Sequence, residues 1–115
     1  MSRDWTFFLE DIQDACTKIA KYTFELSFDA FQADEKTYDA VVRNLEIIGE
    51  ATKSLPDEVL AMMPEVEWGK AIGLRNIIAH AYFGVNDQIL WDVVQNKIPV
   101  LKQTVDRLMT GLNKP

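Results

Sequence analysis

Apolar residues recur every three or four positions through most of this 115-residue chain. The pattern is clearest in four segments, at about 4–22, 34–54, 66–83 and 86–112. Because an α-helix turns once in about 3.6 residues, this spacing gathers the apolar side chains of each segment on one face. Amphipathic helices with short connections bury such faces against one another. We therefore predict an all-α fold, an up-down bundle of four to five helices that forms a single domain over residues 1–115.

The connections are predicted to be short. A polar and aromatic stretch through Phe28 and Phe31 follows the first helix and has room for a helical turn of its own. A short helix is expected over 56–63, between Pro56 and Pro64, because proline marks helix boundaries. Cys16 falls on the apolar stripe of the first helix, so we interpret it as a small core residue.

Three positions should shape the helices themselves. Gly49 falls inside the second long helix, where glycine costs about 1 kcal/mol relative to alanine, so we expect another helix to cross closely there. Asn86 or Asp87 can cap the last helix. Pro99 should kink that helix, because its ring clashes with the carbonyl group of Gln95.

Composition limits the cellular setting and the partners. No apolar run approaches the roughly 20 residues that cross a bilayer, so we expect no membrane association. The N-terminus, Met1 to Asp4, lacks the apolar core of a signal peptide, and a single cysteine points to a reducing compartment. We therefore expect a cytoplasmic protein. The net charge of −6 weighs against strong RNA binding, unless a local or shared basic surface provides it.

One run carries the residues best suited to chemistry, Arg75-Asn76-Ile77-Ile78-Ala79-His80-Ala81-Tyr82. It holds the only histidine of the chain, and histidine both accepts and donates a proton near neutral pH. On a helix, Arg75, Asn76, His80 and Tyr82 lie away from the core face. Arginine grips phosphate through a planar fork of donors. A proton shuttle near a phosphate ligand is what RNA cleavage requires, with Asn76 orienting either group.

Ordinary structural roles remain open for the same residues. His80 near a helix C-terminus can satisfy free carbonyl groups, and Asn76 can bond to the backbone. Arg75 can pair with Glu46 or Glu50 on the second helix, and Tyr82 can be a half-buried aromatic residue. The sequence shows no Cys/His cluster, glycine-rich phosphate loop or metal-nuclease motif, so we expect neither a metal ion nor a cofactor.

The run from Arg75 to Tyr82 resembles the signature of the HepT family, a branch of the HEPN superfamily of small helical proteins. That signature is an arginine, four to six residues of which the first is polar, a histidine, and a tyrosine two places later. The likeness extends to Arg43-Asn44-Leu45-Glu46-Ile47-Ile48-Gly49-Glu50-Ala51, to Trp68 and to Tyr82-Phe83-Gly84-Val85. It therefore covers nearly the whole chain.

This resemblance implies a HEPN-type bundle that forms a homodimer, with Arg75 and His80 of both subunits lining one cleft. It implies a metal-independent RNA endonuclease toxin, acting on tRNA or mRNA, with Arg75, Asn76 and His80 as its catalytic residues. The implied partner is a cognate MntA-like nucleotidyltransferase antitoxin that neutralises the toxin by adenylylating Tyr82, alone or in a larger assembly. The alternative is a non-catalytic companion that binds substrate for a nucleotidyltransferase or regulates it.

Overall fold

The structure, a computed structural model, describes residues 5–66 and 87–112. Every regular element in these ranges is a helix, so the prediction of an all-α fold is confirmed. No helix within them combines the length and the apolar character needed to cross a membrane. In chain order the elements are α1 (Trp5–Thr23), α2 (Phe28–Ala33), α3 (Glu35–Lys53), α4 (Asp57–Leu60), α6 (Asp87–Asp92), the π-helical turn η1 (Val93–Lys97) and α7 (Ile98–Leu112).

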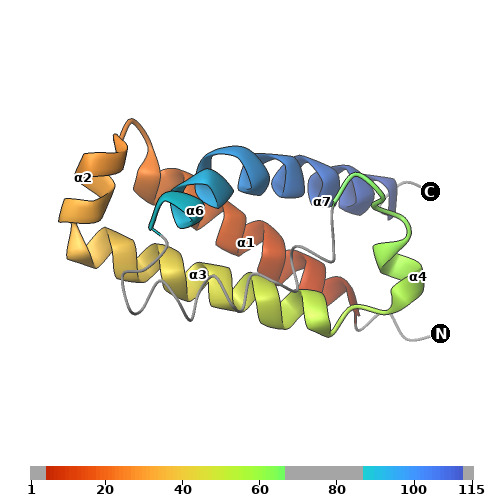
Figure 1. Cartoon of the computed structure of the whole chain (residues 1–115). Coiled ribbons are helices and arrows are strands. Elements are labelled where there is room, and N and C mark those ends of the chain that lie inside the picture. The colour runs from red at the N-terminus through yellow and green to blue at the C-terminus, as the bar shows by residue number, and fades with distance from the viewer. Residues whose placement is uncertain (1–4, 67–86, 113–115) are drawn as a thin grey trace.

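Three long helices, α1, α3 and α7, lie along the length of the molecule and pack side by side (Figure 1). The short helix α2 closes one end of this bundle, and α4 lies at the opposite end (Figure 1). The helix α6 sits near α2 and contacts it. The predicted apolar stripes therefore meet along the bundle axis, and they bury one continuous core. Its fully buried large side chains are Leu9, Ile12, Ile19, Phe31, Val41, Val42, Leu45, Ile48, Val59, Met63, Leu90 and Val105.

Cys16 belongs to this core, as the sequence predicts, with no exposed surface. Burial raises the pKa of its thiol to about 12, because the charged thiolate would lose its hydration inside the bundle. The nearby carboxylate of Asp106 acts in the same direction, while Lys102 opposes it. A thiol held protonated in this way is a packing residue and a poor nucleophile at neutral pH.

Side-chain caps define the connection between α1 and α3. The Ser27 hydroxyl accepts a hydrogen bond of 3.1 Å from the backbone amide of Ala30 and so begins α2. Asp34 begins α3 in the same way, accepting from the Thr37 amide at 3.1 Å and from its hydroxyl at 2.8 Å. These hydrogen bonds, led by the one from the Thr37 amide, lower the pKa of Asp34. The aromatic connection is therefore a capped helix.

The predicted interruption at Pro99 is present, and it takes the form of the π turn η1 just before that residue. Proline has no N–H to donate, and its ring would clash with the carbonyl group of Gln95 in a regular α-helix. The wider π turn relieves this conflict by adding a residue, and the Ile98 amide donates to the carbonyl of Val93 instead. The helix changes direction between α6 and α7 at this turn (Figure 1).

No described residue crosses close to Gly49, and the stretch 67–86 lies outside the described residues, so the expectation of a close helix crossing there stays a prediction. Among the described residues, a Cβ atom built on this glycine meets no heavy atom within 4 Å outside the local helix backbone. Leu45 and Thr52, one turn before and one turn after Gly49, belong to the buried stripe of α3, and the partly buried Gly49 lies at the edge of that stripe. Glycine at this position therefore has no packing role within the described structure.

Candidate functional site

The four residues singled out for chemistry, Arg75, Asn76, His80 and Tyr82, fall in the stretch 67–86 and lie outside the described residues. Their predicted roles therefore stay predictions. The structure does describe the chain on either side of this stretch. It also describes α3, which carries the second part of the resemblance.

On the upstream side, the chain is tied to α7. The Glu65 carboxylate forms an ion pair with the Arg107 guanidinium group, and the Val66 amide donates to the carbonyl of Met63 at 3.2 Å. A hydrogen bond from its own backbone amide, joined by the bond from Arg107, lowers the pKa of Glu65. Both side chains are substantially exposed, Arg107 by 63% and Glu65 by 37%, so solvent screens the pair.

On the downstream side, the chain is held more firmly. Asp87 is the first residue of α6, and its carboxylate accepts hydrogen bonds from two other elements. The Tyr38 hydroxyl of α3 donates at 2.5 Å, and the Gln32 amide of α2 donates at 2.9 Å. We name these three residues, Gln32, Tyr38 and Asp87, the Asp87 clasp. The carboxylate of Asp87 is therefore used to join helices, while Asn86, the other proposed cap, lies outside the described residues.

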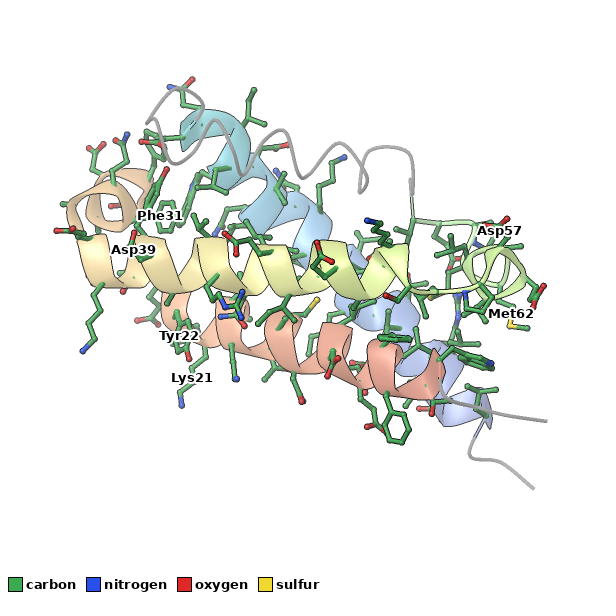
Figure 2. All side chains as sticks on the ribbon, turned by 90° about the horizontal axis from the view of Figure 1, so that it is seen from below. Lys21, Tyr22, Phe31, Asp39, Asp57 and Met62 are labelled. Atoms are coloured by element: carbon green, nitrogen blue, oxygen red, sulfur yellow. The ribbon has the colours of Figure 1, made fainter. Side chains whose placement is uncertain are left out.

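A cluster of aromatic rings packs next to the Asp87 clasp. Phe31 is fully buried, and its ring centroid lies 5.2 Å from that of Tyr38 and 4.9 Å from that of Trp91. Phe28 contacts Trp91 at 6.3 Å. Phe31 lies where α2, α3 and α6 meet, on the opposite side of α3 from Tyr22 in the view of Figure 2. The ring contacts of Phe31 with Tyr38 and Trp91 therefore help to hold the Tyr38 hydroxyl at Asp87.

The electrostatics of the clasp keep the Tyr38 hydroxyl protonated, so that it can donate its hydrogen bond to Asp87. Burial raises the pKa of the Tyr38 hydroxyl, and the hydrogen bond to Asp87 and the negative charge of that residue raise it further. Tyr38 therefore stays protonated as a donor throughout the physiological pH range. A hydroxyl donating to a carboxylate is a strong, charge-assisted bond, which agrees with its short length.

The helix α3 presents a polar face beside α1. Arg43, 71% exposed, pairs with Glu46 one helical turn later at 3.4 Å. Asn44 of the same signature is buried and donates to the carbonyl of Ala40 at 2.8 Å. A groove of about 230 Å³ runs between α1 and α3. It is lined by Phe8, Asp11, Arg43, Glu46, Ile47, Glu50, Ala51 and Ser54.

The Asp87 clasp was not foreseen from the sequence. The sequence pattern suggests a capping role for Asp87 and gives no reason to bring Tyr38 or Gln32 to its carboxylate. The hydrogen bonds join residues 49 and 55 positions apart, and periodicity within a helix carries no information on such pairs. Across the described ranges, no group of three His, Cys, Asp or Glu residues is placed to hold a metal ion.

Comparison with known proteins extends this picture to the whole chain. The family described as "Ribonuclease HepT-like" matches residues 12–108, which include both α3 and the run from Arg75 to Tyr82. This chain belongs to the HepT-like family. No solved structure matches it significantly.

Relatives of similar length support this membership. The chain is 42% identical to a protein of Thermococcus cleftensis named "Probable ribonuclease HepT", over 94% of this chain and 98% of that protein. It is 43% identical to a protein of Methanocaldococcus jannaschii whose name describes it as a candidate RNase, over 84% of this chain and 80% of that protein. The likeness therefore spans most of this chain and most of each relative.

Proposed function

We propose that this HepT-like protein is a ribonuclease, and more narrowly an RNA endonuclease that works without a metal ion. The observation that carries the proposal is the family match over residues 12–108. That range contains His80, the only histidine of the chain, together with Arg75. Metal-free RNA cleavage needs a group that both accepts and donates protons, and histidine is the side chain suited to this near neutral pH.

The proposed chemistry uses the 2′-hydroxyl of the RNA as the nucleophile. His80 takes the proton of this hydroxyl, whose oxygen then attacks the adjacent phosphorus atom and displaces the 5′ oxygen of the next nucleotide. The leaving oxygen receives a proton from a general acid, and a 2′,3′-cyclic phosphate remains on the first nucleotide. Arg75 binds the phosphate, where negative charge builds up in the transition state, and Asn76 orients His80 or the phosphate.

A homodimer completes this arrangement. One chain supplies one histidine, whereas cleavage uses a base and an acid. A two-fold cleft shared by two chains offers two copies of His80 and two of Arg75. The paired arginines also create a local positive surface on a protein whose net charge is −6.

Regulation by a partner follows from the same signature. The proposed partner is an MntA-like nucleotidyltransferase antitoxin, the proposed acceptor is Tyr82, and the target of the free toxin is tRNA or mRNA. An AMP group on Tyr82 would bring bulk and negative charge near the phosphate-binding arginine, and both oppose RNA entry. Mass spectrometry of protein co-expressed with the partner should find one added AMP on Tyr82. Unmodified Tyr82 in protein that the partner keeps inactive would exclude this route.

The nuclease assignment is tested by cleavage of RNA in the presence of a chelator. Purified protein should cut RNA in EDTA, and His80→Ala should reduce the rate by at least about 100-fold, because it removes the proton-transfer group. Arg75→Ala should also reduce the rate, whereas Arg43→Ala, the same change at an exposed arginine of α3, should leave it within about twofold. Cleavage that stops in EDTA, or full activity of His80→Ala, would contradict the proposal.

The net charge favours one alternative, a non-catalytic companion of a nucleotidyltransferase. An acidic surface repels RNA and suits a protein partner with a basic surface. Expression of the chain without its partner separates the two functions. Growth arrest that requires His80 supports the nuclease, and harmless expression of well-folded protein supports the companion.

A further inference from the structure

The Asp87 clasp lies next to the stretch that carries the proposed catalytic residues. Asp87 follows Tyr82 by five positions and His80 by seven. Its carboxylate is held by the Tyr38 hydroxyl at 2.5 Å and by the Gln32 amide at 2.9 Å. The clasp therefore connects two capped helices on one side of the bundle to the chain that leads directly from Tyr82 into α6.

Buried aromatic and apolar side chains pack against the Asp87 clasp. The ring of Tyr38 packs on Phe31, which has no exposed surface, and Phe31 packs in turn on Trp91 of α6. Leu90, also of α6, is fully buried. Movement of Asp87 away from Tyr38 would therefore disturb both a strong hydrogen bond and an aromatic cluster.

The ion pair between Glu65 and Arg107, on the upstream side of the stretch 67–86, is a weaker restraint than the Asp87 clasp. Glu65 and Arg107 are largely exposed, and a solvent-screened pair of this kind contributes little to rigidity. The Tyr38 contact to Asp87 is partly buried and joins residues far apart in sequence. Of these two interactions, the Tyr38–Asp87 hydrogen bond is the stronger restraint, and along the sequence it is the one nearer to His80 and Tyr82.

We propose that Tyr38 is a positioning residue of the ribonuclease: it holds Asp87 and thereby sets the position of His80 and Tyr82 relative to the bundle. The inference rests on the proposed function. Seven residues reach at most about 25 Å when fully extended, so a restraint at Asp87 limits where His80 can lie. Because a misplacement of about 1 Å can slow catalysis by up to about 100-fold, loss of this restraint should be visible in the rate.

The first test separates turnover from binding. Tyr38→Phe keeps the packed ring and removes only the hydroxyl, and it should lower kcat by about tenfold while KM changes by less than about twofold. Tyr22→Phe makes the same change at a tyrosine 37% exposed on α1 and should leave both constants unchanged. Because the two partners act as a unit, Tyr38→Phe combined with Asp87→Ala should be no slower than the slower single variant.

The second test reads the position of His80 without any activity. As the only histidine of the chain, His80 gives unambiguous imidazole signals in ¹H–¹³C NMR spectra. Tyr38→Phe should shift these signals and move the titration midpoint by at least about 0.2 pH unit, because the surroundings of the ring change. Gln32→Ala, at an exposed position, should act in the same direction with smaller effect. Tyr22→Phe should leave the signals in place.

The outcomes distinguish this inference from the function on which it rests. Folded Tyr38→Phe protein whose His80 signals, titration and kcat all match the wild type would overturn the positioning role, even if its melting temperature falls. A wild-type chain that cleaves no RNA would contradict the proposed function instead. The His80 signals of the variants would still show whether Tyr38 positions that residue.

Discussion

Buried threonines on the three long helices differ in how their hydroxyl groups are satisfied. Thr23 and Thr104 each donate to a carbonyl one turn earlier, that of Ile19 and that of Val100, at 2.8 Å. Among the buried side-chain atoms of the described residues, the Thr52 hydroxyl oxygen has no hydrogen-bond partner. A buried polar atom without a partner loses its hydration and gains nothing in return. Thr52 is therefore a weak point of the core.

Replacing Thr52 by valine should raise the free energy of unfolding by about 1 kcal/mol, because the methyl group fits the same space without the desolvation cost. Thr104→Val is the matched control. It removes a satisfied hydroxyl and should lower stability by about 1 kcal/mol. Chemical denaturation of both variants gives the comparison. Equal changes of the same sign in the two proteins would show that the Thr52 hydroxyl is satisfied in solution.

At the scale of elements, the helices follow the sequence pattern except where backbone geometry intervenes. The π turn η1 precedes Pro99 and accommodates its ring, and no other described residue lies close to Gly49 on α3. Glycine in a helix interior loses more conformational entropy on folding than alanine does, and a close contact that excludes a Cβ atom is one reason for a protein to keep it. No such contact exists at Gly49 in the described structure, so its backbone freedom is a cost to stability.

Gly49→Ala should therefore stabilise the protein, by about 0.5 to 1 kcal/mol, since alanine restricts the unfolded chain and strains nothing in the folded one. Gly111 is also unobstructed, but it lies one residue from the end of α7, where the helix frays. Gly111→Ala should have a smaller effect. Thermal unfolding followed by circular dichroism measures both. Destabilisation by Gly49→Ala would reveal a close contact of Gly49 with a part of the protein beyond the described residues.

At the scale of the whole molecule, charge and stoichiometry belong together. A chain with a net charge of −6 and a single histidine is poorly equipped to cleave RNA alone. In the proposed homodimer, two chains around a two-fold axis would provide a second proton-transfer group and bring two arginines to one phosphate. The proposed dimer is thus the unit in which the proposed chemistry would become complete.

Activity should consequently depend on protein concentration. The cleavage rate per chain should fall when the protein is diluted below the dissociation constant of the dimer, because single chains lack the second histidine. Analytical ultracentrifugation gives that constant, and cleavage assays over the same concentrations give the rate. A constant rate per chain at dilutions where sedimentation shows only monomers would exclude the shared cleft.

Much of the fold could be predicted because local patterns govern helices. The first helix was expected at about 4–22 and runs over Trp5–Thr23, and the second was expected at about 34–54 and runs over Glu35–Lys53. Three-residue and four-residue spacing of apolar side chains is sufficient for both. The proposed catalytic residues came from a short motif, and their structural roles remain predictions.

The chain's residue order alone determined the class of the fold, the position of its helices and its membership of the HepT-like family, because each depends on patterns within a few turns of helix or on similarity along the chain. Only the tertiary structure decided that Tyr38 and Gln32 meet Asp87 and that Pro99 is accommodated by a π turn. These outcomes depend on which helix surfaces meet in space, and packing between distant segments leaves no periodic trace in a single sequence.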